Sequence, residues 1–219
     1  MHNHILFFLI MAAMLSGNVT TGMCQKNAYI QPVPPELDVI IQDSTNWWMQ
    51  NSWHFNVYGR PLSQVYEDFN LITDSLERSL DHVCKLFRIR DAGLISWYGL
   101  PGPVDSLGST GKAYPDFGIV LSTYNDTLRH YATRQVTQVL LGRTWGTPKS
   151  PFMEEGVVAM VEEWVGFDQD RQRVQDVVAN LANRGKIPSI DRLVADFDTY
   201  PKNQSYSVAA SFLSYLFSR

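Results

Sequence analysis

The sequence lacks the long apolar and strongly charged segments that would indicate a membrane or nucleic-acid role. No Lys/Arg-rich run occurs, and the formal net charge is −4 over 219 residues, so nothing points to nucleic acid or an anionic membrane surface as a partner. The apolar run at residues 5–15 has 11 residues, whereas a membrane-spanning helix needs about 20. The length and the hydrophobic content of 45% predict one globular domain with a single core.

The N-terminus has the pattern of a signal peptide. The apolar run Ile5–Leu15 is followed by the small and polar stretch Ser16–Gly22, which is typical of a secretory signal with cleavage near Gly17 or Gly22. The alternative is a buried N-terminal strand or helix. Residues 1–23 are therefore predicted to be a signal peptide, and the mature protein is expected to lack a transmembrane segment and to be secreted or to reside in the cell envelope or periplasm.

Cysteine is scarce, with Cys24 and Cys84 as the two in the chain. In an oxidising compartment two cysteines can pair, so a disulfide between them is the favoured interpretation. The alternative is a lipid anchor on Cys24. Met23 stands directly before it, where a lipidation signal carries a small residue, and this disfavours the anchor.

Two regions are expected after the signal peptide. Residues 24–53 contain Pro32, Pro34 and Pro35 and are predicted to be an extended lead-in, and residues 54–219 are predicted to form the domain. Alternating or apolar runs predict its strands, and apolar residues spaced by three and four predict its helices. The expected strands are His54–Tyr58, Leu94–Tyr98 and Phe117–Thr123, and the expected helices are Pro61–Phe87, Asp126–Leu141, Glu154–Trp164, Asp170–Asn183, Ile190–Phe197 and Tyr206–Phe217. The last helix reaches the C-terminus without a stop signal, which indicates a chain that is cut short.

The segment from Arg134 to Leu140 has the shape of a zinc-helix motif whose metal chemistry is missing. It aligns with H-E-x-T-H-V-L, with Arg134 and Gln138 in place of the two histidines and Gln135 in place of the glutamate. Downstream, Pro151–Ala159 is similar to the segment in which gluzincin peptidases carry their third zinc ligand, a glutamate. Glu155 stands at that position.

Further segments extend the resemblance to the gluzincin-type "peptidase MA-like" domains. It covers the chain from about His54 to the C-terminus, with the pieces in consistent order. The matching segments are H-F-N-V-Y at residues 54–58, G-K-A-Y-P-D at residues 111–116 followed by an edge strand at residues 118–121, G-K-I-P-S-I at residues 185–190, and S-V-A-A-S-F-L-S-Y at residues 207–215. The resemblance implies an α+β fold in which a small mixed or antiparallel sheet packs on a mainly helical, zincin-like core.

A second alignment of the motif helix is also open. In it His130, Tyr131 and Arg134 match the first histidine, the glutamate and the second histidine, so that one imidazole is kept and the general base is lost. The first alignment agrees better with Val139 and Leu140, whereas the second keeps Thr133 at the matching position. In neither does a second histidine fall one turn away.

The ligand count argues against a metal. Zinc sites need at least three good protein ligands, and His130 with Glu155 would supply two at best. We therefore expect no catalytic residue, no metal ligand and no cofactor. Arg134 is instead expected to pair with Glu155 and tie the two helices together, the alternative being an Arg134 side chain exposed to solvent.

These patterns predict an exported peptidase-like protein without catalytic activity. Its role would be binding a peptide or polymer, or a structural one in the envelope or outside the cell. The alternative is an active metal-dependent peptidase or hydrolase with an atypical site around His130 and Glu155, supported by Glu154 and dependent on zinc.

Overall fold

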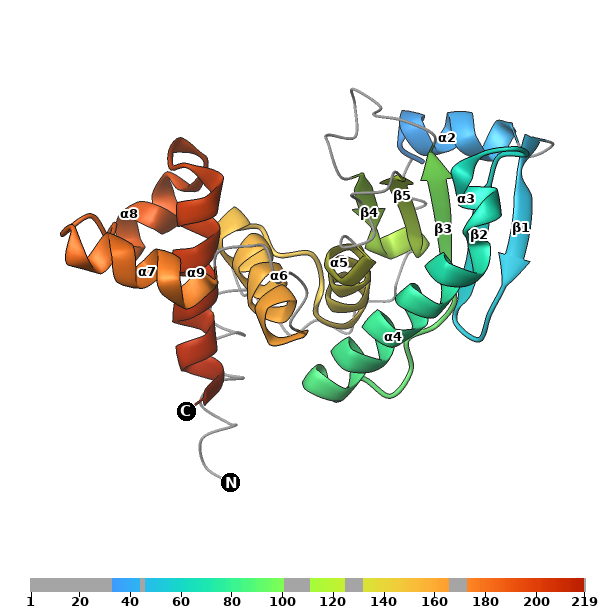
Figure 1. Ribbon diagram of the computed structural model, residues 1–219. Coiled ribbons are helices and arrows are strands. Elements are labelled where there is room, and N and C mark those ends of the chain that lie inside the picture. The colour runs from blue at the N-terminus through green and yellow to red at the C-terminus, as the bar shows by residue number, and fades with distance from the viewer. Residues whose placement is uncertain (1–32, 44–45, 101–110, 125–131, 166–172, 219) are drawn as a thin grey trace, which may run out of the picture. The chain divides into compact units, whose positions relative to one another are not determined.

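The computed structural model describes residues 33–43, 46–100, 111–124, 132–165 and 173–218 (Figure 1). The chain divides into two compact units, residues 1–46 together with residue 219, and residues 47–218. The predicted signal peptide, Cys24, His130 and Tyr131 lie outside the described residues.

In the first unit the prediction of an extended lead-in is wrong over residues Pro35–Gln42, which form helix α2. The prolines begin this helix. The carbonyl of Pro34 accepts hydrogen bonds from the backbone N–H groups of Leu37 and Asp38 at 2.9 and 3.1 Å, and Pro35 occupies the first helical position, where its missing N–H costs nothing. The end of the predicted lead-in also contains strand β1, Trp48–Asn51, which belongs to the second unit.

The second unit contains a five-stranded mixed sheet with the order β1-β2-β3-β5-β4. Strands β2–β3 and β3–β5 pair in parallel, and the outer pairs β1–β2 and β4–β5 are antiparallel. The further strands are β2 (Phe55–Gly59), β3 (Ile95–Leu100), β4 (Lys112–Tyr114) and β5 (Ile119–Thr123). The predicted α+β class with a mixed sheet is confirmed.

The strand predicted around residues 118–121 is present as β5, but its predicted position at the edge is wrong, because β5 lies between β3 and β4. A 3-10 turn at Pro115–Phe117 precedes Gly118, which has a φ of 63°. This left-handed conformation, which glycine adopts at no steric cost, reverses the chain. Strand β4 consequently forms the edge.

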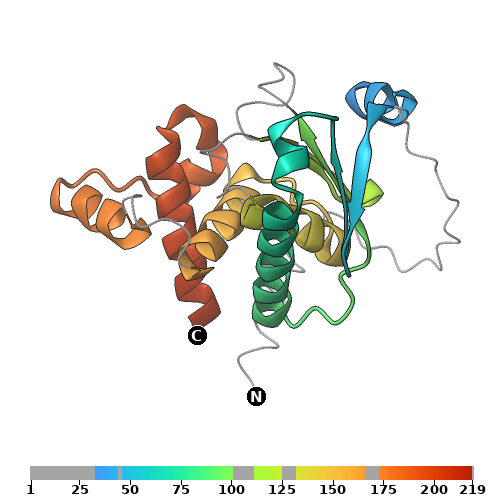
Figure 2. The same cartoon turned by 45° about the vertical axis from the view of Figure 1, so that its right-hand side comes forward.

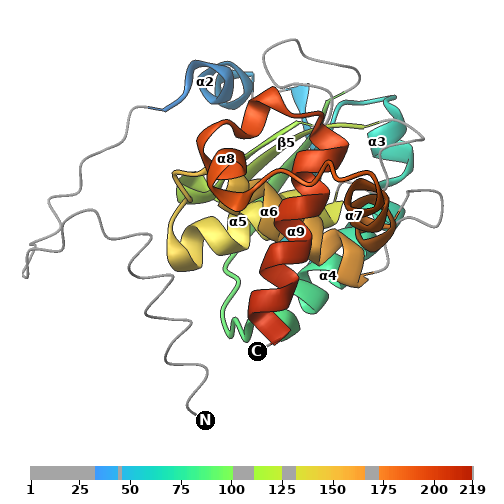
Figure 3. The ribbon, with the colours of Figure 1, turned by 90° about the vertical axis from the view of Figure 1, so that its left-hand side faces the viewer.

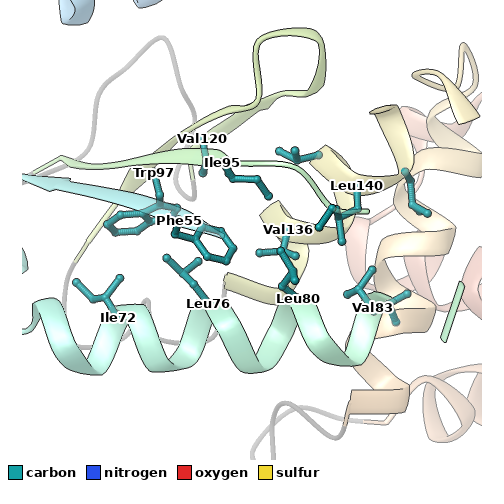
Figure 4. Close-up of a cluster of buried hydrophobic side chains, with 14 of the residues drawn as sticks. Phe55, Ile72, Leu76, Leu80, Val83, Ile95, Trp97, Val120, Val136 and Leu140 are labelled. Atoms are coloured by element: carbon teal, nitrogen blue, oxygen red, sulfur yellow. The ribbon is translucent and has the colours of Figure 1, made fainter. Parts of the chain in front are cut away.

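One face of the sheet packs on helices α4 (Phe69–Phe87) and α5 (Ala132–Trp145), which contact each other (Figures 1 and 2). Figure 4 shows the contact layer, in which apolar side chains of both helices meet the middle of strands β2, β3 and β5. The labelled members are Phe55, Ile72, Leu76, Leu80, Val83, Ile95, Trp97, Val120, Val136 and Leu140.

The single long helix predicted from Pro61 is instead two helices, α3 (Gln64–Glu67) and α4. Ser63 is the N-cap of α3, because its side chain accepts a hydrogen bond from the N–H of Tyr66. Leu62, expected on the buried stripe, has a φ of 61° and is 92% exposed. The apolar spacing continues through the break at Asp68, which is the C-cap of α3 and the N-cap of α4.

The remaining helices form a layer on the side of α6 (Pro151–Val165) away from α5 (Figures 1 and 3). They are α7 (Val174–Asn183), α8 (Ile190–Ala195) and α9 (Lys202–Ser218). Helix α7 ends at Asn183, as predicted, and Gly185 follows with a φ of 60°. The N–H of Lys186 donates to the carbonyl of Leu181 at 2.9 Å, which closes the helix end. Within the described ranges no helix combines the length and apolarity needed to cross a bilayer.

Helix α5 continues to Trp145, beyond the predicted end at Leu141. Arg143 in its last turn donates to the carbonyls of Ala92 and Leu94 at 2.8 and 2.7 Å. These bonds fasten the helix end to the segment that enters β3, which is a tertiary contact that no local stop signal reveals.

Candidate functional site

Two polar side chains on α5 face two carboxylates on α6. Arg134 contacts Glu155 through Nη2 and Oε2, and Gln138 donates from Nε2 to Oε1 of Glu154 at 3.3 Å. Arg134 and Gln138 are four residues apart and therefore lie on one helix face. The prediction that the two helices pack together with Glu155 directed at the first is confirmed.

The Arg134–Glu155 pair is largely shielded from water, with side-chain exposures of 15% and 18%. The prediction of this pair is confirmed, and the alternative of a solvated arginine is wrong. The guanidinium also lies 5.7 Å from the ring centre of Tyr206 on α9. Burial alone would lower the pKa of Arg134, but the charges of Glu155 and Glu162 outweigh it, and the pKa is raised. Arg134 is a permanent cation.

Glu154 differs from Glu155 in its partner. Glu154 accepts a hydrogen bond from the neutral amide of Gln138. Burial, and then the charge of Glu155, raise the pKa of Glu154 against the opposing effects of Arg134 and Gln138. The pKa of Tyr206 is raised for the same two reasons. The cluster thus holds one carboxylate that is paired with a cation, Glu155, and one whose ionisation is disfavoured by burial and by a neighbouring negative charge, Glu154.

Gln135, at the position of the catalytic glutamate in the first alignment, faces the sheet. Its side chain is buried at 2% exposure. Its Oε1 accepts a hydrogen bond from Trp97 Nε1 at 3.1 Å, and its Nε2 donates to Ser122 Oγ at 3.0 Å. Trp97 and Ser122 were not among the predicted site residues, because they come from strands far away in sequence. Their position on the inward face of β3 and β5 is the one signal that could have found them.

The residues at the motif positions do not fit zinc. A guanidinium carries no lone pair for a metal, and the amide of Gln138 is already bonded to Glu154. In the part of the chain that the structure describes, no group of three His, Cys, Asp or Glu side chains could hold a metal ion. His130 and Tyr131 lie outside the described residues, so the second alignment stays a prediction. What the described arrangement does is join α5 to α6 by ionic and polar contacts.

Cys84 lies half-buried on α4 against the core. Burial, and then the charge of Asp81, raise the pKa of its thiol, which is therefore protonated at neutral pH. Because Cys24 lies outside the described residues, the disulfide stays a prediction.

A comparison with protein-family models gives no match, and none of the curated proteins matches the chain. The site is therefore interpreted from its own geometry. That geometry consists of two helices joined by the Arg134–Glu155 ion pair and by the hydrogen bond from Gln138 to Glu154.

Proposed function

We propose that this chain is an exported, peptidase-like protein without catalytic activity, in which the Arg134–Glu155 pair replaces a metal ion. The contact between these two residues is the observation that carries the proposal. A zinc helix presents two side chains one turn apart to a carboxylate on a second helix. Here Arg134 and Gln138 have that spacing, and Glu155 and Glu154 receive them.

The side chains at these positions support the absence of hydrolysis. Peptide hydrolysis by this class of site needs a polarised water and a general base. Arg134, held as a cation, cannot accept a proton, and the amide of Gln135 has no basic site and is bonded on both sides. The carboxylate of Glu155 is paired with Arg134, so it is not available to bind a metal ion or to act as a general base.

Export is part of the proposal and is supported by the apolar run Ile5–Leu15. The role proposed for the exported protein is binding of a peptide or polymer, or a structural role in the envelope or outside the cell. The compact packing of α5, α6 and α9 around the pair supports a stable scaffold.

The test is to restore the two imidazoles. In the variant Arg134→His/Gln138→His, Glu155 is released from its ion pair and becomes available as a third ligand. We expect this variant to bind one zinc ion in titration calorimetry, and the triple variant with Glu155→Gln to bind it far more weakly. The parent chain should purify without stoichiometric zinc.

Two results would contradict the proposal. A folded double variant that takes up no zinc would show that positions 134, 138 and 155 do not have the geometry of a metal site. A parent chain that carries stoichiometric zinc, lost on Glu155→Gln, would favour the active alternative around His130 and Glu155.

A further inference from the structure

Strand β1, Trp48–Asn51, is an outermost strand of the sheet. Among the described residues, β2 is the strand that pairs with it, and no strand lies on its other edge. An edge of this kind presents a row of backbone N–H and C=O groups that can pair with another chain.

The described edge lacks charged side chains, proline and a bulge, three of the features that commonly block such pairing. Protein edges are commonly protected by charged side chains, proline or a bulge. Residues 46–53 contain no charged residue and no proline, and the register of β1 with β2 is continuous from Trp48 to Asn51. Trp48 is 53% exposed and Met49 is 50% exposed. A neutral strand with large exposed apolar side chains favours association.

The strand is also held in place before any partner arrives. The turn that follows it is fastened to α4 by Glu77, which accepts from Ser52 Oγ at 2.5 Å and contacts Nδ1 of His54 at 2.8 Å. On the strand itself, Gln50 donates to Asn70 of α4 at 2.7 Å. A strand that is already ordered loses little conformational entropy on pairing, so that more of the contact energy appears as affinity.

These observations lead us to infer that β1 pairs with β1 of a second copy of this chain, antiparallel about a twofold axis through Met49. Trp48 contacts Tyr66 of α3 with ring centres 4.9 Å apart, and Gln50 bonds to α4. Met49 and Asn51 therefore point to the opposite face of the sheet.

A second copy fits this edge because the strand complements itself. With the axis at Met49, each Met49 lies opposite its counterpart, and Trp48 of one copy lies opposite Gln50 of the other. Opposed residues then share a face, as antiparallel pairing requires. No like charges meet, because the strand has none. The two sheets join into one continuous sheet, in which neither copy of β1 is an edge strand any longer.

The decisive experiment is a charge exchange at Met49, read by sedimentation velocity over a range of concentrations. The parent chain should show a reversible monomer–dimer equilibrium. Met49→Lys and Met49→Glu each place like charges opposite one another across the axis and should weaken the dimer about tenfold or more. An equimolar mixture of the two variants should recover the dimer, because Lys then faces Glu.

Val194→Lys is the matched control, since Val194 is 46% exposed and lies on α8, whose contacts are with α6 and the 3-10 turn at Phe197–Thr199. It should leave the dimer unchanged, and circular dichroism should show that every variant is folded. A parent chain that stays monomeric at all concentrations overturns the inference. So does a dimer that survives Met49→Lys, or a mixture of the two variants that fails to associate.

Discussion

At the scale of single residues, the Arg134–Glu155 pair is the feature whose removal should cost most. Two charges taken out of water gain little net stability from each other, yet either one left alone is strongly unfavourable. With exposures of 15% and 18%, these side chains approach that buried limit. The pair therefore acts more as a constraint on how α5 meets α6 than as a source of stability.

Glu155→Ala should lower the free energy of unfolding by about 3 kcal/mol, because it leaves the cation of Arg134 without its partner. Replacing both members, as in Arg134→Met/Glu155→Leu, should recover most of this loss. Urea denaturation measures both. Asp81→Asn is the control, since it breaks the exposed Lys85–Asp81 pair and should change stability by less than about 0.5 kcal/mol. A Glu155→Ala variant as stable as the parent would show that the Arg134–Glu155 pair does not constrain the fold in this way.

Glu77 should make stability fall at acid pH. Burial opposes its ionisation, but hydrogen bonds from Ser52 and His54 prevail and lower its pKa below the ordinary value of 4.5. A lowered pKa contributes stability that is present above 4.5 and is lost as the pH falls through the folded-state pKa. Glu77→Gln should cost about 1–2 kcal/mol at pH 7, and the difference from the parent should shrink at acid pH. A loss that is constant with pH would argue against this.

Glu154 should behave in the opposite sense. Because burial and Glu155 raise its pKa above 4.5, its ionised form is disfavoured in the folded state. The associated stability is fully present below pH 4.5 and is lost as the pH rises through the raised pKa. Glu154→Gln should therefore increase the melting temperature at pH 7 and have little effect at pH 4. A destabilised variant at pH 7 would show that the contact with Gln138 outweighs the burial of charge.

At the scale of elements, periodicity was sufficient to predict β2, β3, β5 and the central helices. It failed where a single residue redirects the chain. The backbone leaves helical geometry at Asp68, which divides the long predicted helix, and Pro35 begins α2 where an extended segment was expected. Both involve residues whose local role competes with the apolar spacing around them.

The candidate site was predictable only in part. The motif spacing led to Arg134 and Glu155, since two helices that follow each other with a short connection tend to pack together. The bonds of Gln135 to Trp97 and Ser122 join segments 38 and 13 residues apart. Such contacts depend on how the sheet lies against α5, which no local pattern contains.

The contact between α6 and α9 depends on Gly156. A Cβ at this position would lie 2.8 Å from Cβ of Ala209 and 2.9 Å from Cδ1 of Leu213. Gly156→Ala should therefore destabilise by about 1–3 kcal/mol through overpacking, although alanine is the better helix former by about 1 kcal/mol. Thermal unfolding measures the balance. Asn180→Ala, at an exposed position of α7, is the control and should be neutral or slightly stabilising.

At the scale of the whole second unit, two hydrophobic clusters share the same helices. The first joins the sheet to α4, α5 and parts of α6 and α9, and the second joins α7 and α8 to the remaining parts of α6 and α9. Phe152 and Val157 on α6 belong to different clusters, as do Ala209 and Ala210 on α9. The two clusters should therefore lose their structure together.

Leu193→Ala tests this coupling, because Leu193 is fully buried in the second cluster, which contains no tryptophan. The cavity should cost about 2–5 kcal/mol and lower the midpoint detected by tryptophan fluorescence. The six tryptophans of the chain include Trp97 and Trp145 in the first cluster and none in the second. Leu80→Ala should shift the same transition by a similar amount. Val194→Ala, at a position 46% exposed, is the control and should have little effect. A Leu193→Ala variant that loses helix in a separate, earlier step, with its fluorescence midpoint unchanged, would show instead that the C-terminal helices unfold independently of the sheet.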